Sequence, residues 1–503
     1  MRSGEILRFL TNRASTLVAA QQPERGLSRR RLLATGAAAL AGILKADRSL
    51  AAPPTAATQW LVNRLTLGWT PEEQLLADTL GYHGYIDYHL NYQSIDDSAL
   101  NAKLVPYWGL VLDPYELWFI NASCVINETI QTTLLRAVYS KRQLFERMVE
   151  FWTDHFCIDI TKADCPWIKI VDDRDVIRPH ALGNFQDLLV ASAQSPAMME
   201  YLDNATSVAG NPNENYAREL MELHTLGVSG GYTQQDVQEV ARCLTGWGVN
   251  DTGTTDHLRF RYNADDHDND SKLVLGTTIP AGGGINDGLI VLDILAHHPS
   301  TANFIATKLC KRFYGYSPPV SLINSVAATF SSTGGDISKT MSTLLHTMDP
   351  AGAELKIKRP FHLFVSALRA TKAQFQGDPN AFGTQIRVDL SLCGQEPFFH
   401  GQPDGYPDKL ESWDSLLLPR WNFMEAFTRG AVDDISIDVD SLLAGATTPQ
   451  EITEKINEVM FGGTMTAAEI SAVQNYVAAG PFELIRIQDA IALALSSPTF
   501  QWY

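Results

Sequence analysis

The sequence predicts a mainly α-helical, multi-helix globular protein with a small β-hairpin insertion. Apolar residues recur at the helical spacing of about 3.6 residues wherever a pattern is clear. Strand-like alternation is confined to residues 258–262 and 272–275, which we expect to pair as the hairpin. The 503 residues, 45% hydrophobic and 19% charged, are enough to bury a large core.

The first 51 residues resemble a twin-arginine signal peptide. Arg29 and Arg30 precede a mildly apolar run at 34–44 that is too short to span a membrane, and a small residue, Ala51, follows. The alternative is a disordered basic tail. We expect export by the twin-arginine route to a periplasmic or extracellular location. Proteins on this route cross the membrane folded, and many acquire a metal or organic cofactor first.

The charge balance narrows the class of partner. Residues 1–51 carry nine Arg and Lys against three Asp and Glu, so their removal takes the formal net charge from −18 to −24. Such acidity argues against nucleic acid or an anionic membrane surface as a ligand. No later stretch is long and apolar enough to predict a membrane span in the mature chain.

Helical patterns fill most of the remaining chain. They lie at residues 58–65, 72–80, 131–156, 237–244, 287–296, 301–313, 337–347, 360–370, 421–428, 467–479 and 484–495. Thr233 with Asp236 resembles a capping pair, and Gly227 is a natural helix stop. We expect a helical lobe at 52–250, an Asp-rich β insertion at 251–284 and a second helical lobe at 285–503, with linker-like composition at 394–412.

The densest chemical pattern lies between Asn211 and Gly227. On a helix, Asn215, Glu219 and Glu222 form one polar stripe, while the opposite face is apolar. A second cue is His155, near the end of a helix whose other face is aromatic. His155 suits a metal ligand or general base, although a single such histidine is more often a core residue.

These blocks closely resemble the DUF1800 family of exported bacterial proteins, whose activity is undefined. The resemblance covers nearly everything after residue 58. It rests on residues 152–156, 179–185, 196–204, 211–227, 232–237, 244–247, 266–268 and 495–500.

The resemblance implies that several polar side chains belong together. The family pattern includes His155, His180, Asp203, Asn204, Glu214, Asn215, Arg218, Glu219 and Glu222. A divalent metal site with two histidines and one or two carboxylates would satisfy many of them. We therefore expect an enzyme, with hydrolysis as the first reaction class and oxidation as the second.

The roles expected for that enzyme follow from side-chain chemistry. His155 and His180 would be metal ligands or bases, and Glu219 and Glu222 would be ligands or proton carriers. Arg218 would bind an anionic substrate group or hold the carboxylates. We expect His224 to be a packing residue unless the fold brings it beside one of the two histidines.

The competing interpretation is structural. Arg218 lies four residues from both Glu214 and Glu222, the spacing of ordinary helix ion pairs. In that case the chain would be a non-catalytic binding or maturation partner. The resemblance implies which partner, because DUF1800 proteins are often encoded beside exported DUF1501-type proteins.

Two further patterns are weaker. Asp266, Asp268 and Asp270 alternate like the start of a calcium loop, but the Gly and Glu of an EF-hand are missing, so a solvated acidic turn is the favoured alternative. The chain has six cysteines and no CxxC pair. A bridge between Cys157 and Cys165 and buried free thiols are both compatible with this spacing.

Overall fold

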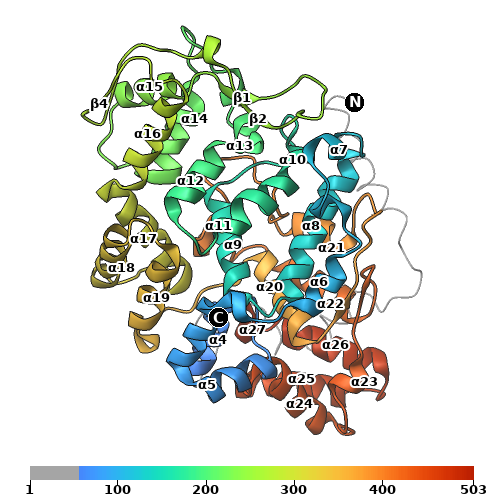
Figure 1. The fold of residues 1–503 in the computed structure, drawn as a ribbon. Helices are drawn as coiled ribbons and strands as arrows, with labels where there is room; N and C mark the ends of the chain where they lie inside the picture. Colours follow the sequence, from blue (N-terminus) through green and yellow to red (C-terminus); the bar gives the residue numbers. More distant parts are fainter. Residues whose placement is uncertain (1–55) are drawn as a thin grey trace.

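The computed structural model describes residues 56–503 and confirms the mainly α-helical class (Figure 1). The predicted signal peptide at 1–51 lies outside the described residues. The helices up to residue 243 are α4 (Ala57–Leu65), α5 (Pro71–Leu90), α6 (Ser98–Leu104), α7 (Pro114–Trp118), α8 (Ala122–Tyr139), α9 (Gln143–His155), α10 (Cys165–Asp172), α11 (Arg178–His180), α12 (Phe185–Ala193), α13 (Pro196–Tyr201), α14 (Glu214–Glu219) and α15 (Gln234–Cys243).

The rest of the chain is also helical. Its helices are α16 (Ile285–Ala296), α17 (Pro299–Phe313), α18 (Val320–Ser332), α19 (Ile337–Thr347), α20 (Pro360–Ala370), α21 (Gln385–Leu392), α22 (Leu417–Thr428), α23 (Val439–Leu442), α24 (Pro449–Phe461), α25 (Ala467–Ala478), α26 (Leu484–Leu495) and α27 (Pro498–Gln501). Short 3-10 turns are η2 (Tyr92–Ser94), η3 (Trp108–Leu110), η5 (Asn204–Thr206), η7 (Ala264–Asp266), η8 (Pro350–Gly352) and η9 (Leu410–Ser412). Two π-helical turns are η4 (Asp173–Ile177) and η6 (Leu220–Thr225).

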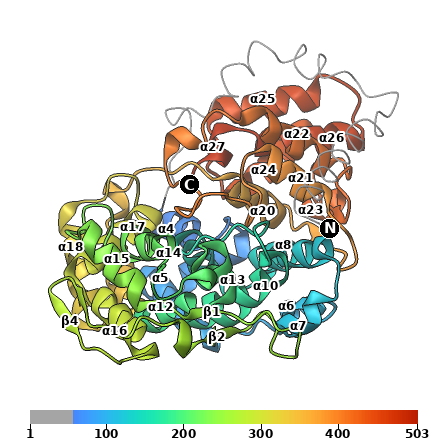
Figure 2. The ribbon, with the colours of Figure 1, turned by 90° about the horizontal axis from the view of Figure 1, so that it is seen from above.

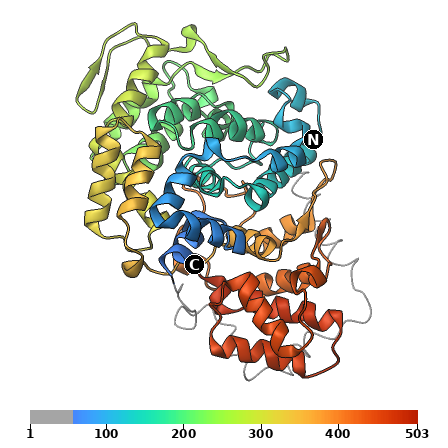
Figure 3. The ribbon, with the colours of Figure 1, turned by 60° about the horizontal axis from the view of Figure 1, so that its bottom comes forward.

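Two large hydrophobic cores organise these helices. The first joins α4 and α5 to α9, α10 and α12–α19, and the second joins α8 to the helices from α20 onward. The C-terminal helices α22–α26 accordingly gather at one end of the molecule (Figures 1 and 2), with α4 and α5 between them and the remainder (Figure 3). Residues on both sides of the 251–284 insertion share the first core, and the lobe boundaries drawn at 250 and 284 stay predictions.

The helix expected at 131–156 is divided into α8 and α9. Ser140 adopts an extended conformation after α8, and the Gln143 side chain donates to the carbonyls of Ala137 and Ser140 at 3.1 and 2.7 Å. These bonds satisfy carbonyls that a helix end leaves without partners. The division fixes α9 as a separate helix that carries His155 at its end.

The predicted pairing of 258–262 with 272–275 is wrong. β2 (Phe260–Tyr262) pairs with β1 (Trp247–Val249), and β3 (Lys272–Val274) pairs with β4 (Thr277–Ile279). Leu275 and Gly276 both have positive φ, as a two-residue type I′ hairpin turn requires. A third small antiparallel pair joins β5 (Gln374–Phe375) to β6 (Ile435–Ser436).

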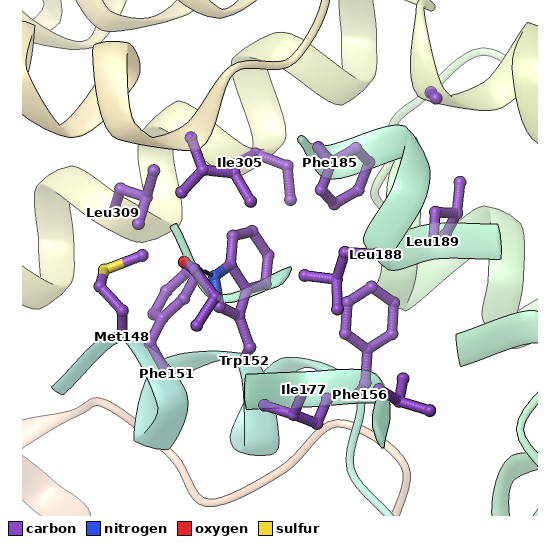
Figure 4. Close-up of a cluster of buried hydrophobic side chains, with 14 of the residues drawn as sticks. Met148, Phe151, Trp152, Phe156, Ile177, Phe185, Leu188, Leu189, Ile305 and Leu309 are labelled. Atoms are coloured by element: carbon purple, nitrogen blue, oxygen red, sulfur yellow. Dashed lines mark hydrogen bonds between the residues drawn. The ribbon is translucent and has the colours of Figure 1, made fainter. Parts of the chain in front are cut away.

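The aromatic face predicted for α9 is buried. Trp152 lies among Phe185, Leu188 and Ile305 from α12 and α17 (Figure 4), and its indole N–H donates to the Ala181 carbonyl at 2.9 Å. This packing anchors the end of α9 against α17. No helix among residues 56–503 is long and apolar enough to cross a membrane.

Candidate functional site

His155 is held in one defined protonation state. It is 1% exposed, and its Nε2 lies 3.0 Å from the carbonyl oxygen of His224. A carbonyl only accepts, so Nε2 carries the proton and Nδ1 accepts from the Lys308 amine at 2.8 Å. Burial, and then the charge of Lys308, lower the pKa of His155 well below its usual value. The imidazole is therefore neutral.

His224 comes from the π-helical turn η6, which follows α14. The i to i−5 bond from Leu226 N to Met221 O at 2.8 Å marks the wide turn. The His224 ring is fully buried, with its centroid 6.0 Å from that of His155, and burial lowers its pKa to about 3. His224 thus lies beside His155. We expected His224 to be a packing residue unless the fold brought it beside one of the two histidines, and that condition is met. π-Helical turns are also frequent at functional sites.

Lys308 projects from α17 toward the end of α9. Burial lowers the pKa of its amine to about 8, while the carboxylates of Asp154 and Asp404 act in the opposite direction. The residue as a whole is only partly buried, so its stem and amine have different environments. An amine with this pKa is available both with and without its proton near neutral pH.

The acidic neighbours of Lys308 differ in how firmly they are paired. Asp154 accepts from Arg359 at 2.6 Å, whereas Asp404, with a side chain 58% exposed, has His400 at 3.1 Å. The loop carrying Asp404 packs directly on α9, because a Cβ added to Gly405 would lie 2.0 Å from the Asp154 carbonyl oxygen. The segment with linker-like composition at 394–412 therefore forms one wall of the site.

Glu219 contributes the second unusual carboxyl group. Burial and the neighbouring Glu222 raise its pKa, Arg218 opposes this, and Asp404 raises it further. Asp404 is thus within electrostatic reach of both Glu219 and Lys308. Glu222 accepts from the Tyr232 hydroxyl at 3.2 Å, but Glu219 has no hydrogen-bond partner among residues 56–503.

Arg218 forms part of the predicted ion pairing. Its Nη2 lies 3.1 Å from Glu214 and 3.0 Å from the Gln234 side-chain oxygen, and no salt bridge to Glu222 forms within the described chain. The Arg218 and Glu214 side chains are 40% and 35% exposed. The interpretation that these residues form ordinary helix ion pairs therefore explains Glu214, but it does not explain Glu219.

The residues expected to bind a metal do not converge. No three His, Cys, Asp or Glu side chains between residues 56 and 503 form a group that could hold one. Both ring nitrogens of His155 have other partners, and His180, partly exposed at the end of α11, has no hydrogen bond to His155. The donor set proposed from His155, His180, Glu219 and Glu222 thus does not fit a metal ion here.

The Asp-rich segment is also occupied by protein partners. Arg242 binds both oxygens of Asp268 at 2.8 and 3.1 Å, and Asp266 accepts from Asn263 at 2.6 Å. Asp270 is exposed. This arrangement matches the acidic-turn alternative better than the calcium site.

All six cysteines are free, so the Cys157–Cys165 bridge is wrong and the free-thiol alternative is confirmed. Cys157 is buried beside the site, where its thiol lies 3.8 Å from the His400 carbonyl oxygen. Burial raises the pKa of Cys157 well above its usual value. The thiol is therefore not an activated nucleophile.

A cavity of about 60 Å³ adjoins Asp154 and is lined by side chains of both large cores, Val149 of the first and Phe361 and Phe398 of the second. Its walls include Val149, Phe361, Phe398 and Tyr406, so apolar and aromatic side chains meet the carboxylate. Pockets that bind small molecules commonly have this mixed lining. The cavity reaches Asp154 and also Glu146, Asp173 and Arg178, whereas Lys308, His155 and Glu219 are not part of its lining.

Sequence reasoning missed Lys308, Asp154 and Asp404. A signal for Lys308 was present, because at helical spacing it shares a stripe with Thr301 and Ile305, which are buried. A lysine on such a stripe requires an explanation. Asp404 gave no signal, because its place depends on how an irregular loop packs on α9.

The family model described as "Protein of unknown function (DUF1800)" matches residues 60–502. No curated protein and no solved structure matched the chain.

Proposed function

The chain belongs to the DUF1800 family, and we propose that it is an exported acid/base enzyme, a hydrolase, acting through Lys308, His155 and Glu219. One observation carries this proposal. A neutral His155, fixed by the His224 carbonyl, accepts a hydrogen bond from a lysine whose pKa is lowered to about 8. Perturbed groups of this kind are enriched at catalytic sites.

The proposed roles follow from the protonation states. Neutral Lys308 removes a proton from water as its oxygen attacks an acyl-type carbon, and His155 orients the amine through Nδ1. The raised pKa of Glu219 increases the fraction of molecules in which it is protonated, and in that form it delivers its proton to the leaving group as the bond to carbon breaks. The proton on Lys308 then returns through solvent to Glu219. No step is routed through a metal, because the side chains do not converge on one.

Arg218 supports substrate binding in this proposal. Nη2 is its only nitrogen with a partner among the described residues, and the side chain is 40% exposed. Its remaining N–H groups suit an anionic group on the substrate. Glu222, hydrogen-bonded to Tyr232, raises the pKa of Glu219 by like-charge repulsion.

The test compares two lysines of α17. Signal-processed parent, Lys308→Met and Lys311→Met proteins are assayed on chromogenic esters, amides, glycosides and phosphate esters. Lys311 is exposed, so its variant is the matched control. We expect hydrolysis by the parent and control and a loss of about 10²–10⁴-fold in Lys308→Met. Equal activity of all three proteins, or no hydrolysis of any class by the parent, would reject the proposal.

Export is proposed from residues 1–51. Replacing Arg29 and Arg30 by Lys removes the paired arginines while keeping the charge. We expect the precursor to stay in the cytoplasm, as measured by fractionation of cells that make each form. Unchanged export of this variant would contradict the twin-arginine route.

A second candidate function, a binding partner for an exported DUF1501-type protein, is favoured by exposed apolar side chains. Val105, Val111 and Phe119 are 71–80% exposed within residues 105–119, around α7, and contiguous exposed apolar surface marks partner contacts. Co-purification with a co-expressed DUF1501-type protein, lost in Phe119→Asp, would support this role. Its absence would leave the segment without a partner function.

A further inference from the structure

The cavity on the α4 side of the C-terminal strand lies away from the proposed site. Residues 356–358 run antiparallel to the chain end, with Lys356 and Tyr503 exchanging two backbone hydrogen bonds at 2.9 Å and Lys358 N donating to Gln501 O at 2.7 Å. Side chains alternate along a strand, so Lys356 and Lys358 point to the same side. A cavity of about 40 Å³, lined by Lys358 and Tyr503, lies beside this strand.

The two lysines of this strand have very different partners. Both are at least 96% buried, but Lys356 has the Asp408 carboxylate at 2.7 Å. The amine of Lys358 has no hydrogen bond or ion pair among residues 56–503, and it lies 4.0 Å from the ring centroid of Phe500. A buried ammonium group without a counter-ion is costly. Lys358 lacks the acidic partner that Lys356 has, and an anion from solution would supply one.

The surroundings of the cavity carry further unpaired cationic donors. The guanidinium groups of Arg64 and Arg147 lie 5.0 and 5.4 Å from the ring centroid of Tyr503. Arg64 Nε and Nη1 and Arg147 Nε are buried without hydrogen-bond partners in the described chain. Burial raises the pKa of Tyr503, but Arg147, Lys356 and Arg64 outweigh it and lower that pKa to about 8. The field at this end of the cavity is positive.

We propose that the cavity beside Lys358 binds one small monovalent anion, such as chloride or formate, as the counter-ion of the Lys358 ammonium group. The cavity volume suits one small anion, because a cavity of about 10–15 Å³ holds one water molecule and this cavity is about three times larger. The bound anion fastens the C-terminal strand to α4 and α20. Without it, burial alone lowers the pKa of Lys358 to about 7.

The test measures thermal unfolding of the signal-processed protein at pH 6.5 and constant ionic strength, in sodium chloride or formate against sodium gluconate, whose anion is too large for the cavity. We expect the melting temperature to be about 2 °C higher in chloride or formate. The difference should vanish in Lys358→Met and persist in Lys372→Met, which removes an exposed lysine paired with Glu72. Equal melting temperatures in all salts, or a difference kept by Lys358→Met, would overturn the proposal.

If Lys358→Met does not fold, anomalous diffraction from crystals of the parent protein tests the proposal instead. Crystals of the parent grown with bromide in place of chloride are measured at the bromine absorption edge. An anomalous peak within about 3.5 Å of Lys358 Nζ is expected. Well-ordered water in the cavity with no anomalous signal would show that water, and not an anion, satisfies the amine.

Discussion

The two ends of α9 carry polar clusters that differ in how completely they are paired. At the start, Arg178 binds both oxygens of Glu146 at 3.1 and 2.9 Å and Asp173 at 2.7 Å. At the other end, Lys308 and Glu219 lack such partners, and the pKa of each is displaced toward its neutral form. Complete pairing points to a structural role, and incomplete pairing points to chemistry.

The largest effect is expected from breaking the paired cluster. Arg178→Met removes the cation that binds both Glu146 and Asp173 and leaves these buried carboxylates with the weaker charges of Arg136 and Lys169, so we expect a loss of about 3–5 kcal/mol in the free energy of unfolding. Urea denaturation measures the loss. Arg259→Met, which removes an exposed pair with Asp113, is the control and should change stability by less than about 1 kcal/mol.

The same cluster predicts a pH dependence. Burial raises the pKa of Asp173, but Arg178 and Arg136 outweigh it, so the folded-state pKa is below its usual value. Stability from this group is present above the unfolded pKa of about 4 and is lost as pH falls through the folded value. Arg178→Met should weaken this acid-side loss. An unchanged acid limb would mean that Arg178 is not the main partner of Asp173.

The incompletely paired cluster should also gain stability as pH rises, but on the alkaline side, because folding disfavours the charged form of Lys308. Because the folded protein lowers the pKa of Lys308 to about 8, the unfolded state binds more protons between about pH 8 and 10.4, and stability rises with pH there. Lys308→Met should abolish this rise and increase stability by about 1 kcal/mol at pH 7, after discounting for partial exposure. Denaturation at pH 7 and pH 10 measures both effects. A destabilised Lys308→Met would place Lys308 with the structural cluster.

The same contrast explains what the sequence could predict. The helices and the aromatic face of α9 follow from apolar spacing, which is local. The strand pairing failed because the Leu275–Gly276 turn, and not the Asp-rich segment, sets the register of β3 and β4. Capping by Thr233 and Asp236 was predictable, because both residues lie within one turn.

The candidate site was only partly predictable for a related reason. His155 and Glu219 stand in recognisable patterns, and burial with the local neighbour Glu222 raises the pKa of Glu219, but the lysine that lowers the pKa of His155 comes from α17 and the smaller contribution of Asp404 comes from the loop at 394–412. Those contacts join residues more than 150 positions apart. No local pattern encodes such a contact. The metal site was predicted from side-chain types alone, with no information on these long-range contacts.

The smallest effect on stability is expected at Arg218, where the comparison can be sharpened. Its pair with Glu214 is about 35–40% exposed and spaced i,i+4, so Arg218→Met should cost about 0.3–0.5 kcal/mol. If Arg218 binds an anionic substrate group, the variant should raise KM and leave kcat nearly unchanged, because that contact exists before and during the reaction. Glu214→Gln removes the same ion pair without removing the guanidinium group, so it should match the stability change but not the change in KM. A raised KM in both variants would mean that the ion pair, and not the free N–H donors of Arg218, supports binding. Arg218 would then have a structural role like that of Arg178, with a smaller contribution to stability.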